Sequence, residues 1–293
     1  MYSLCCISNM LKPHFSFQSM TWSRYRQLES MYGTDVALST LSDRWYNNVC
    51  VTHKTILHCI KNGWNYRISS SIFPLITHPD FNIPIEQTPK YNDIINIFTA
   101  IRQLVSFMNI RLSTHPDHFN VLATKNTVTL DKSIKELNHH GWFMDLIGCC
   151  RNHNSPINIH INNSRDTYND VVRMLIDNIK MLDDSVSSRL VFENEDRGLW
   201  TISALHDHVY NFIGIPITYD NLHHHCNPST GDAELCASTW ANFKPLFHYS
   251  ESQPNNPNIR AHAVMPVGRP PCDHYDWEIE LKGKDLAIKM LLG

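Results

Sequence analysis

Short apolar runs rich in β-branched residues alternate with longer amphipathic stretches along the whole chain. The short runs predict eight strands, at Ser3–Ile7, Tyr66–Ile68, Ile110–Ser113, Ile157–His160, Leu190–Glu193, Ile217–Asp220, Leu246–Tyr249 and Trp277–Glu280. The amphipathic stretches predict helices at about Asp35–Asn62, Tyr91–Met108, Leu130–Ile147, Asp166–Met181, Ile202–Phe212, Ala233–Ser238 and Lys284–Leu292. Strands that alternate with helices in this way are typical of βα units and a parallel sheet.

Three of these helices stop at a glycine, at Gly63, Gly148 and Gly214, which is a common signal for a helix end. A Pro/Asn-rich loop runs from Gln253 to Pro271, and we find no low-complexity tract or linker that would divide the chain. We therefore expect one domain over residues 1–293, with the α/β architecture of a single (β/α)8 barrel of the TIM type.

Residues of metal-binding types stand at, or just past, the ends of seven predicted strands: His78, His115, His160, Glu193, Asp220, His248 and Glu280. Successive members are 37, 45, 33, 27, 28 and 32 residues apart. A barrel of about 250 residues in eight units needs about 31 residues per unit, and its active site lies at the C-terminal ends of the strands. The pattern therefore predicts that the seven side chains converge on one mouth as a metal cluster.

The types of side chain in this set indicate the chemistry. Imidazole with carboxylate suits Zn²⁺, Mn²⁺ or Fe²⁺, whereas oxygen alone would suit Mg²⁺ or Ca²⁺. Asp220 and His223 are three residues apart and could serve two neighbouring ions, and Glu193 could bridge two. Closely spaced ions are a recurrent means of cutting phosphodiesters.

Each residue also has a plainer interpretation. A lone histidine such as His78 or His248 is more often a hydrogen-bonded structural residue than a ligand, although seven residues at one topological position weaken that interpretation. Six of the 18 histidines have no such placement, and we expect surface or packing roles for His139, His140, His153, His206, His208 and His274. The Lys282–Lys284 run is equally compatible with a solvated turn and with a phosphate contact.

Composition narrows the possible classes of protein only slightly. The 293 residues are 42% hydrophobic and 18% charged, which is typical of a globular protein, and the formal net charge of −3 argues weakly against a protein that coats nucleic acid. The nine cysteines are odd in number and form no CxxC pair, which favours reduced thiols and a cytoplasmic or nuclear protein. No uncharged run is long enough to span a bilayer, so we expect a soluble protein with no membrane partner.

A set of short motifs, in order along nearly the whole chain, resembles the UV damage endonucleases. The motifs are Leu4-Cys5-Cys6-Ile7-Ser8-Asn9, Tyr66-Arg67-Ile68-Ser69-Ser70, Leu112-Ser113-Thr114-His115-Pro116-Asp117, Ile157-Asn158-Ile159-His160, Glu193-Asn194-Glu195, Asp220-Asn221-Leu222-His223-His224, His248-Tyr249-Ser250, Ala261-His262-Ala263 and Glu280-Leu281-Lys282-Gly283-Lys284. Any one motif is weak evidence, but the ordered set is specific.

The resemblance implies a fold similar to endonuclease IV and to xylose-isomerase-like barrels, and incision of DNA on the 5′ side of photoproducts. It implies one ion held by His115, His160 and Glu193, a second by Glu193, Asp220, His248 and Glu280, and a third by His223 and His262, with His78 beside them as a ligand or a supporting residue. Within this set the catalytic residues would be Glu193, Asp220, Glu280 and His115. The residues expected to contact DNA or the lesion are Cys6, Asn9, Arg67, His118, Phe119, Lys282 and Lys284.

The chain departs from the family at several of these places. His118 stands where the family usually has Gln, and it precedes Phe119; these two positions probe the lesion in relatives. Cys6 replaces a Tyr of some relatives, and Asn162-Asn163 replaces a Gly-Gly pair. Leu246 stands where some relatives carry a modified lysine, so we do not carry that modification over to this chain.

The resemblance leads us to expect up to three divalent ions, with Mn²⁺ first and Zn²⁺ or Mg²⁺ as alternatives. The expected partner is damaged double-stranded DNA, the expected products are a 3′-hydroxyl and a 5′-phosphate, and the expected assembly is a monomer. Three alternatives stay open: an apurinic-site nuclease, a sugar-phosphate isomerase on the same barrel, or a lesion-binding protein without catalysis.

Overall fold

The computed structural model describes residues 1–293 and contains one eight-stranded parallel sheet. The strands are β1 (Tyr2–Cys5), β2 (Asn65–Ile68), β3 (Leu112–Thr114), β4 (Ile157–Ile159), β5 (Leu190–Glu193), β6 (Ile217–Thr218), β7 (Leu246–Tyr249) and β8 (Asp276–Ile279). Their order is β6-β5-β4-β3-β2-β1-β8-β7, so the first strand lies between the second and the last. The sheet curls into a nearly closed barrel, which confirms the predicted (β/α)8 class.

The seam of the barrel lies between β6 and β7. No full ladder joins these strands, but Asp220 and His248 form an isolated parallel bridge, and the His248 amide donates to the Tyr219 carbonyl at 2.8 Å. Two of the predicted metal ligands are therefore neighbours across the seam, at the C-terminal ends of their strands.

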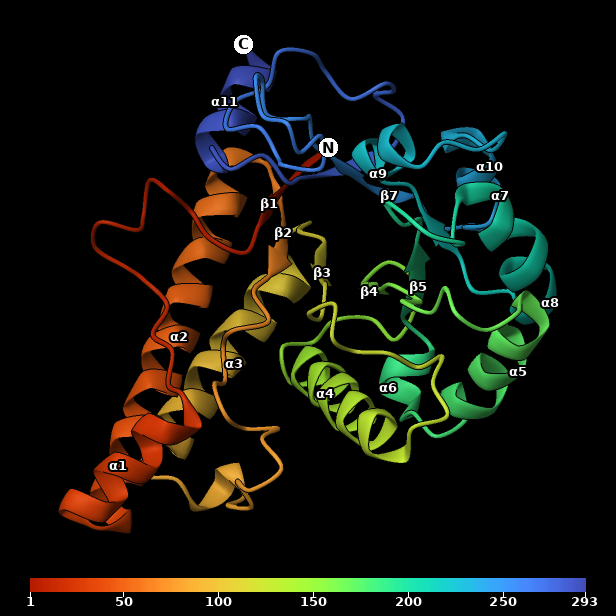
Figure 1. Cartoon of the computed structure of the whole chain (residues 1–293). Coiled ribbons are helices and arrows are strands. Elements are labelled where there is room, and N and C mark those ends of the chain that lie inside the picture. The colour runs from red at the N-terminus through yellow and green to blue at the C-terminus, as the bar shows by residue number, and fades with distance from the viewer.

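Helices surround the strands, as Figure 1 shows. They are α1 (Trp22–Tyr32), α2 (Thr34–Asn62), α3 (Tyr91–Phe107), α4 (Thr127–Leu146), α5 (Tyr168–Ile179), α6 (Asp184–Ser187), α7 (Ile202–Leu205), α8 (Asn211–Ile213), α9 (Asn221–Cys226), α10 (Ala233–Ser238) and α11 (Asp285–Leu292), with short turns of helix at η1 (Ile85–Gln87) and η2 (His206–Tyr210). None of them combines the length and the apolar character needed to cross a lipid bilayer.

The core consists of 61 buried apolar residues that link the barrel to its helices. Strands such as β5 are buried along their whole length, because the helices cover one face and the packed barrel interior covers the other. Four tryptophans are among the largest fully buried side chains: Trp45 on α2, Trp277 on β8, and Trp200 and Trp240 in loops between elements. This packing fixes the strand ends from which the candidate ligands project.

Most predicted elements agree with the structure within a few residues. The long helix ends at Gly63 as expected, since this residue has a left-handed φ of 69° and its amide caps the Cys59 and Ile60 carbonyls. The predictions for β5, β7 and α10 coincide with the observed bounds. The C-terminal helix begins at Asp285, one residue later than predicted.

Other predicted bounds were wrong, and the backbone gives the reasons. The first strand was predicted to reach Ile7 but ends at Cys5, because Cys6 has a φ of 65°, outside the β region. The sixth strand ends at Thr218, because Asp220 caps the next helix. The helix predicted for residues 202–212 is interrupted by the π-helical turn η2.

Candidate metal centre

Six strand ends bring six of the predicted ligands together. His115 follows β3, His160 follows β4, Glu193 ends β5, Asp220 follows β6, His248 lies in β7 and Glu280 follows β8. They form three groups whose ligand atoms lie within 4.8 Å of one another: His115–Glu193–His248, His160–Glu193–His223 and Asp220–His248–Glu280. His223 joins them from α9, one turn after Asp220.

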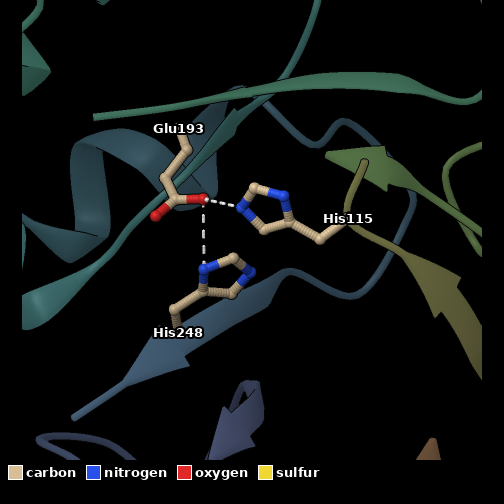
Figure 2. Close-up of side chains that lie close together, drawn as sticks. All are labelled: His115, Glu193 and His248. Atoms are coloured by element: carbon tan, nitrogen blue, oxygen red, sulfur yellow. Dashed lines mark hydrogen bonds and ion pairs between the residues drawn. The ribbon is translucent and has the colours of Figure 1, made fainter. Parts of the chain in front are cut away.

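Glu193 lies at the centre of this cluster. Its Oε2 is 3.0 Å from Nε2 of His115 and 3.2 Å from Nδ1 of His248, and Figure 2 shows both imidazoles directed at the one oxygen. The second carboxylate oxygen, Oε1, is 3.0 Å from Nδ1 of His223. Glu193 thus directs its two oxygens at different ligand side chains, as a bridging carboxylate must.

Backbone carbonyls orient two of the histidines next to Glu193, His115 and His223. Nδ1 of His115 donates to the Pro116 carbonyl at 3.0 Å, which leaves Nε2 directed at Glu193. Nε2 of His160 lies 3.6 Å from Oε2 of Glu193, and the ring centroids of His160 and His223 are 5.6 Å apart. Fixing one ring nitrogen in this way is how proteins set the tautomer of a ligating histidine.

The third group lies at the seam of the barrel. Nδ1 of His248 is 3.8 Å from Oδ2 of Asp220 and 3.4 Å from Oε1 of Glu280. Both Nδ1 of His248 and Oδ2 of Asp220 are buried without a hydrogen-bond partner. Oδ1 of Asp220 is used differently, because it accepts from the His223 amide at 2.7 Å and caps α9.

Burial and mutual charge set the ionisation of the cluster. Burial alone would lower the pKa of His248, but the carboxylates of Glu193 and Glu280 raise it well above its usual range. Burial would raise the pKa of Glu193, and the charges of His248 and His160 hold it well below its ordinary value instead. Burial raises the pKa of Asp220. These carboxylates and imidazoles therefore depend on one another, or on another cation, for neutralisation.

The donor set fits divalent metal ions. Buried carboxylates must be paired with positive charge. Arg67 supplies one such charge, because its guanidinium contacts Glu278 and Glu280 directly. Buried atoms without partners are rare in native proteins, and Nδ1 of His248 and Oδ2 of Asp220 are both of ligand type. The mixture of nitrogen and oxygen atoms suits Zn²⁺, Mn²⁺ or Fe²⁺.

Two predicted ligands lie outside the three groups. Nδ1 of His262 donates to the Glu280 carbonyl at 3.1 Å, which places this ring at the edge of the cluster. The His78 ring stacks on Trp22 with centroids 4.7 Å apart, and its Nδ1 accepts from the Asp80 amide at 3.2 Å. Ligation by His262 and by His78 stays a prediction.

The residues expected to probe the lesion lie together on the surface. Phe119 is 73% exposed, and its ring centroid is 4.1 Å from that of His118. Phe119 also borders a cavity of about 450 Å³ that is lined by Thr77, His78, Pro79, Asp117, Phe119, Asn120, Thr129, Lys132, Ser133 and Glu136. This exposed pair, on the loop that follows the ligand His115, is therefore free to meet a large ligand.

The other residues expected to contact DNA have varied surroundings. Nδ2 of Asn9 donates to the Lys282 carbonyl at 3.1 Å, and Nζ of Lys282 donates to Oε1 of Gln253 at 3.1 Å. Cys6 and Lys284 both have positive φ, at 65° and 54°. Arg67 is buried, with its guanidinium on Glu278 and Glu280, so the structure gives it the role of a counter-ion. DNA contacts by these residues stay predictions.

Two residues of the site were missed by the sequence analysis. Nδ2 of Asn158, on β4, donates to Oε2 of Glu193. Glu278, on β8, is buried beside His248, Arg67 and Ser113. Alternation along β8 would have revealed Glu278, because residues two apart in a strand face the same side and Glu278 precedes Glu280 by two. The same spacing marks Asn158, which precedes His160 by two residues along β4.

The family of the chain follows from comparison of its whole length. Residues 2–293 match the profile of the family described as UV-endonuclease UvdE. The chain belongs to this family. Membership confirms the resemblance drawn from the motifs and the assignment of the chain to the endonucleases.

Curated relatives agree with the family assignment. A UV DNA damage endonuclease of Bacillus velezensis is 29% identical over 297 residues, which cover 94% of this chain and 87% of the relative. A UV DNA damage endonuclease of Bacillus cereus strain Q1 is 28% identical over 291 residues, which cover 92% of this chain and 86% of the relative. The similarity therefore spans nearly the whole of each protein.

Solved structures support the fold. The crystal structure of SacUVDE matches 99% of this chain and 97% of its own, with a TM-score of 0.81 at 23% identity. Endonuclease IV from Thermus thermophilus matches 83% of this chain and 93% of its own, with a TM-score of 0.57 at 14% identity. Both likenesses confirm the predicted barrel class.

Proposed function

We propose that this chain is a metal-dependent DNA repair endonuclease that nicks double-stranded DNA on the 5′ side of UV photoproducts and leaves a 3′-hydroxyl and a 5′-phosphate. One arrangement supports this function above all: Glu193 directs one oxygen at His115 and His248 and the other at His223, at the centre of the ligand cluster in the mouth of the barrel. A pure lesion-binding protein would gain nothing from such buried, mutually dependent carboxylates and imidazoles. A sugar-phosphate isomerase would not account for the membership of the family.

The residues of the cluster would hold the ions in three places that share ligands. His115, His160 and Glu193 would hold one, and Glu193, Asp220, His248 and Glu280 a second. His223 and His262 would hold a third. Bound divalent ions supply Lewis acidity and positive charge for attack of water on a phosphodiester and for departure of the leaving oxygen. Mn²⁺ is our first candidate, with Zn²⁺ and Mg²⁺ as the alternatives.

The protein's own share of the reaction is to fix these groups before DNA arrives. The Asn158 amide donates to Oε2 of Glu193, and the Pro116 carbonyl fixes the ring of His115. The side chain of Asp220 is held by the N-terminus of α9. Groups held in position cost little reorganisation in the transition state, and this lowers the barrier to hydrolysis.

Selection of damaged DNA would fall to the exposed pair His118 and Phe119. Damaged nucleotides cost less to unstack than normal ones, so an enzyme can select distorted duplex without reading its sequence. Phe119 would fill the gap left by the unstacked lesion, and the adjacent cavity of about 450 Å³ would leave room for displaced groups. His118 could add a hydrogen bond there.

A duplex that carries one photoproduct at a defined position tests this function. With Mn²⁺ the enzyme should produce a single cut on the 5′ side of the lesion, and a polymerase should extend the new end because it carries a 3′-hydroxyl. The same duplex with an abasic site in place of the photoproduct serves as the comparison. Cutting at the abasic site alone would instead identify an apurinic-site nuclease, and cutting of neither would contradict the proposal.

A further inference from the structure

We propose that Glu278 is a positioning residue that orients His248 for metal binding, and that Arg67 ties this carboxylate to the ligand Glu280. The inference rests on the proposed function and adds a layer of residues beneath the cluster. Neither Glu278 nor a link through Arg67 was expected from the sequence. The layer consists of Arg67 on β2, Ser113 on β3, His248 on β7 and Glu278 on β8.

Glu278 is buried, and both of its oxygens are engaged. Oε2 lies 3.1 Å from Nε2 of His248 and 3.0 Å from Nη1 of Arg67. Oε1 accepts from the hydroxyl of Ser113. A carboxylate held from three sides inside the barrel has one orientation, so it can impose an orientation on the imidazole that it contacts.

The contact with Glu278 decides which nitrogen of His248 is available as a ligand. A carboxylate only accepts hydrogen bonds, so Nε2 of His248 must carry the proton that faces it. Nδ1 is then the nitrogen left to bind an ion, and it lies 3.2, 3.8 and 3.4 Å from carboxylate oxygens of Glu193, Asp220 and Glu280. A carboxylate on the far nitrogen of a metal-binding histidine fixes its tautomer and raises its basicity as a ligand.

Arg67 connects this layer with the cluster itself. The same Nη1 atom that contacts Glu278 also contacts Oε1 of Glu280. The strand register explains the meeting, because Arg67 pairs with Ser113 across β2 and β3, and His248 pairs with Glu278 across β7 and β8. One guanidinium thus neutralises the positioning carboxylate and steadies a ligand carboxylate.

Asp276 provides a matched comparison on the same strand. It lies two residues before Glu278, faces the same side of β8 and is also buried. Its carboxylate pairs with Arg111, Lys244 and the N-terminal amine, and none of these groups touches the cluster. Asp276 is therefore also a buried, ion-paired carboxylate, but it makes no contact with a ligand.

Binding of Mn²⁺ to metal-free protein tests the inference without any measurement of activity. Free Mn²⁺ is followed by its paramagnetic resonance signal during titration of the wild type, Glu278→Gln and Asp276→Asn. The glutamine keeps the shape of Glu278 but can turn a donor toward His248 and so favour the wrong tautomer. Glu278→Gln should weaken at least one Mn²⁺ site about 10- to 100-fold, the usual cost of removing such a partner.

The control separates positioning from general stability. Asp276→Asn should lower the unfolding midpoint but keep every Mn²⁺ affinity within about 3-fold of the wild type. Equal affinities for Glu278→Gln and the wild type, or equal losses in both variants, would overturn the inference. If Glu278→Gln does not fold, Ser113→Ala takes its place, with an expected loss of about 2- to 10-fold from the weakened hold on Glu278.

An unchanged affinity in Ser113→Ala would then overturn the inference in the same way. A wild-type protein that takes up no Mn²⁺, Zn²⁺ or Mg²⁺ is a different outcome. It would overturn the proposed function itself, and this inference with it, before any variant is compared.

Discussion

At the scale of single residues, the site depends on side chains that serve two partners at once. Glu193 offers one oxygen to His115 and His248 and the other to His223. Asp220 caps α9 through one oxygen and keeps the other for the cluster. Such residues are hard to replace, because a substitute must satisfy both partners in the same position.

Replacement of Glu193 by glutamine should therefore abolish turnover while the protein stays folded. The side chains are nearly isosteric, but the amide of glutamine carries no charge. Its NH₂ group would also present a donor where Glu193 presents an acceptor oxygen to the ligand histidines. We expect kcat to fall on the order of 10³-fold or more, which corresponds to about 4 kcal/mol of transition-state stabilisation. Glu234→Gln, at a carboxylate that accepts from the Tyr275 hydroxyl far from the cluster, is the control. An active Glu193→Gln enzyme with normal metal content would refute the bridging role.

Replacement of Phe119 by alanine should affect lesion recognition alone. Stacking of an aromatic ring on a base contributes about 1–3 kcal/mol, so binding to damaged duplex should weaken about 10- to 100-fold. Binding to undamaged duplex, which depends mainly on phosphate contacts, should change little. Metal content should also stay the same, since Phe119 is 73% exposed and touches no ligand group.

The control for Phe119 is Phe107→Ala, at another exposed phenylalanine, which ends α3. It should leave both affinities unchanged. Equal losses on damaged and undamaged DNA in Phe119→Ala, measured at one salt concentration, would mean that this residue only supports its loop.

The sequence predicts residues whose position follows from the strand pattern. It does not predict contacts between side chains that depend on the direction in which each side chain points. His115, His160 and Asp220 were found because each follows a strand. The contacts of Arg67 with Glu278 and Glu280 were not predicted, because these carboxylates lie more than 200 residues away in the sequence. Spacing alone carries no information about such a contact.

At the scale of elements, helix ends were predictable where one residue type controls the backbone. Gly63 ends α2 because glycine adopts positive φ readily. Asn162 has a φ of 55° after β4, where the family resemblance has glycine, and asparagine is the other residue that tolerates this conformation. The π-helical turn η2 was not predictable, since apolar spacing does not distinguish it from an α-helix.

Helix α4 carries a titratable group that should make stability depend on pH. His139 stacks on Trp142, and burial lowers the pKa of its ring to about 3. The unfolded chain protonates this ring below about pH 6.5, whereas the folded chain does not until about pH 3, so the wild type loses stability as the pH falls through this range. The His139→Gln variant has no ionisable ring at this position, so its stability lacks this part of the dependence on pH.

Urea unfolding at pH 7.5 and pH 5.0 measures the effect of His139. His139→Gln should be less stable than the wild type at pH 7.5, and the difference in the free energy of unfolding should narrow by about 2 kcal/mol at pH 5.0. A difference that is the same at both pH values would contradict a neutral His139 in the folded protein.

At the scale of the whole molecule, the ligands come from six strand ends, β3 to β8. Two of them also lie at the seam between β6 and β7, where no full ladder joins the neighbouring strands. Only the isolated bridge between Asp220 and His248 joins β6 to β7, and both residues belong to one ligand group. The barrel class itself followed from the regular alternation of strands and helices. The position of the seam did not, because it depends on how far each short strand extends.

Metal binding should therefore stabilise the fold as a whole. The unfolded chain cannot assemble ligands from six strands, so Mn²⁺ at about 100 times its Kd should add about 2.7 kcal/mol of stability. This corresponds to a rise of several degrees in the unfolding midpoint, reversed by chelator. Glu193→Gln should lose most of the rise, and an equal rise in wild type and variant would mean that Mn²⁺ binds elsewhere.

The central claim is that the strand-end cluster is a metal-dependent centre that cuts DNA at UV damage. The most direct measurement is nicking of one UV-irradiated and one undamaged supercoiled plasmid, each with added Mn²⁺ and with chelator. We predict that Mn²⁺ converts the irradiated plasmid to the nicked circle, leaves the undamaged plasmid supercoiled, and has no effect when chelator is present. Equal nicking of both plasmids, or nicking that survives the chelator, would contradict the claim.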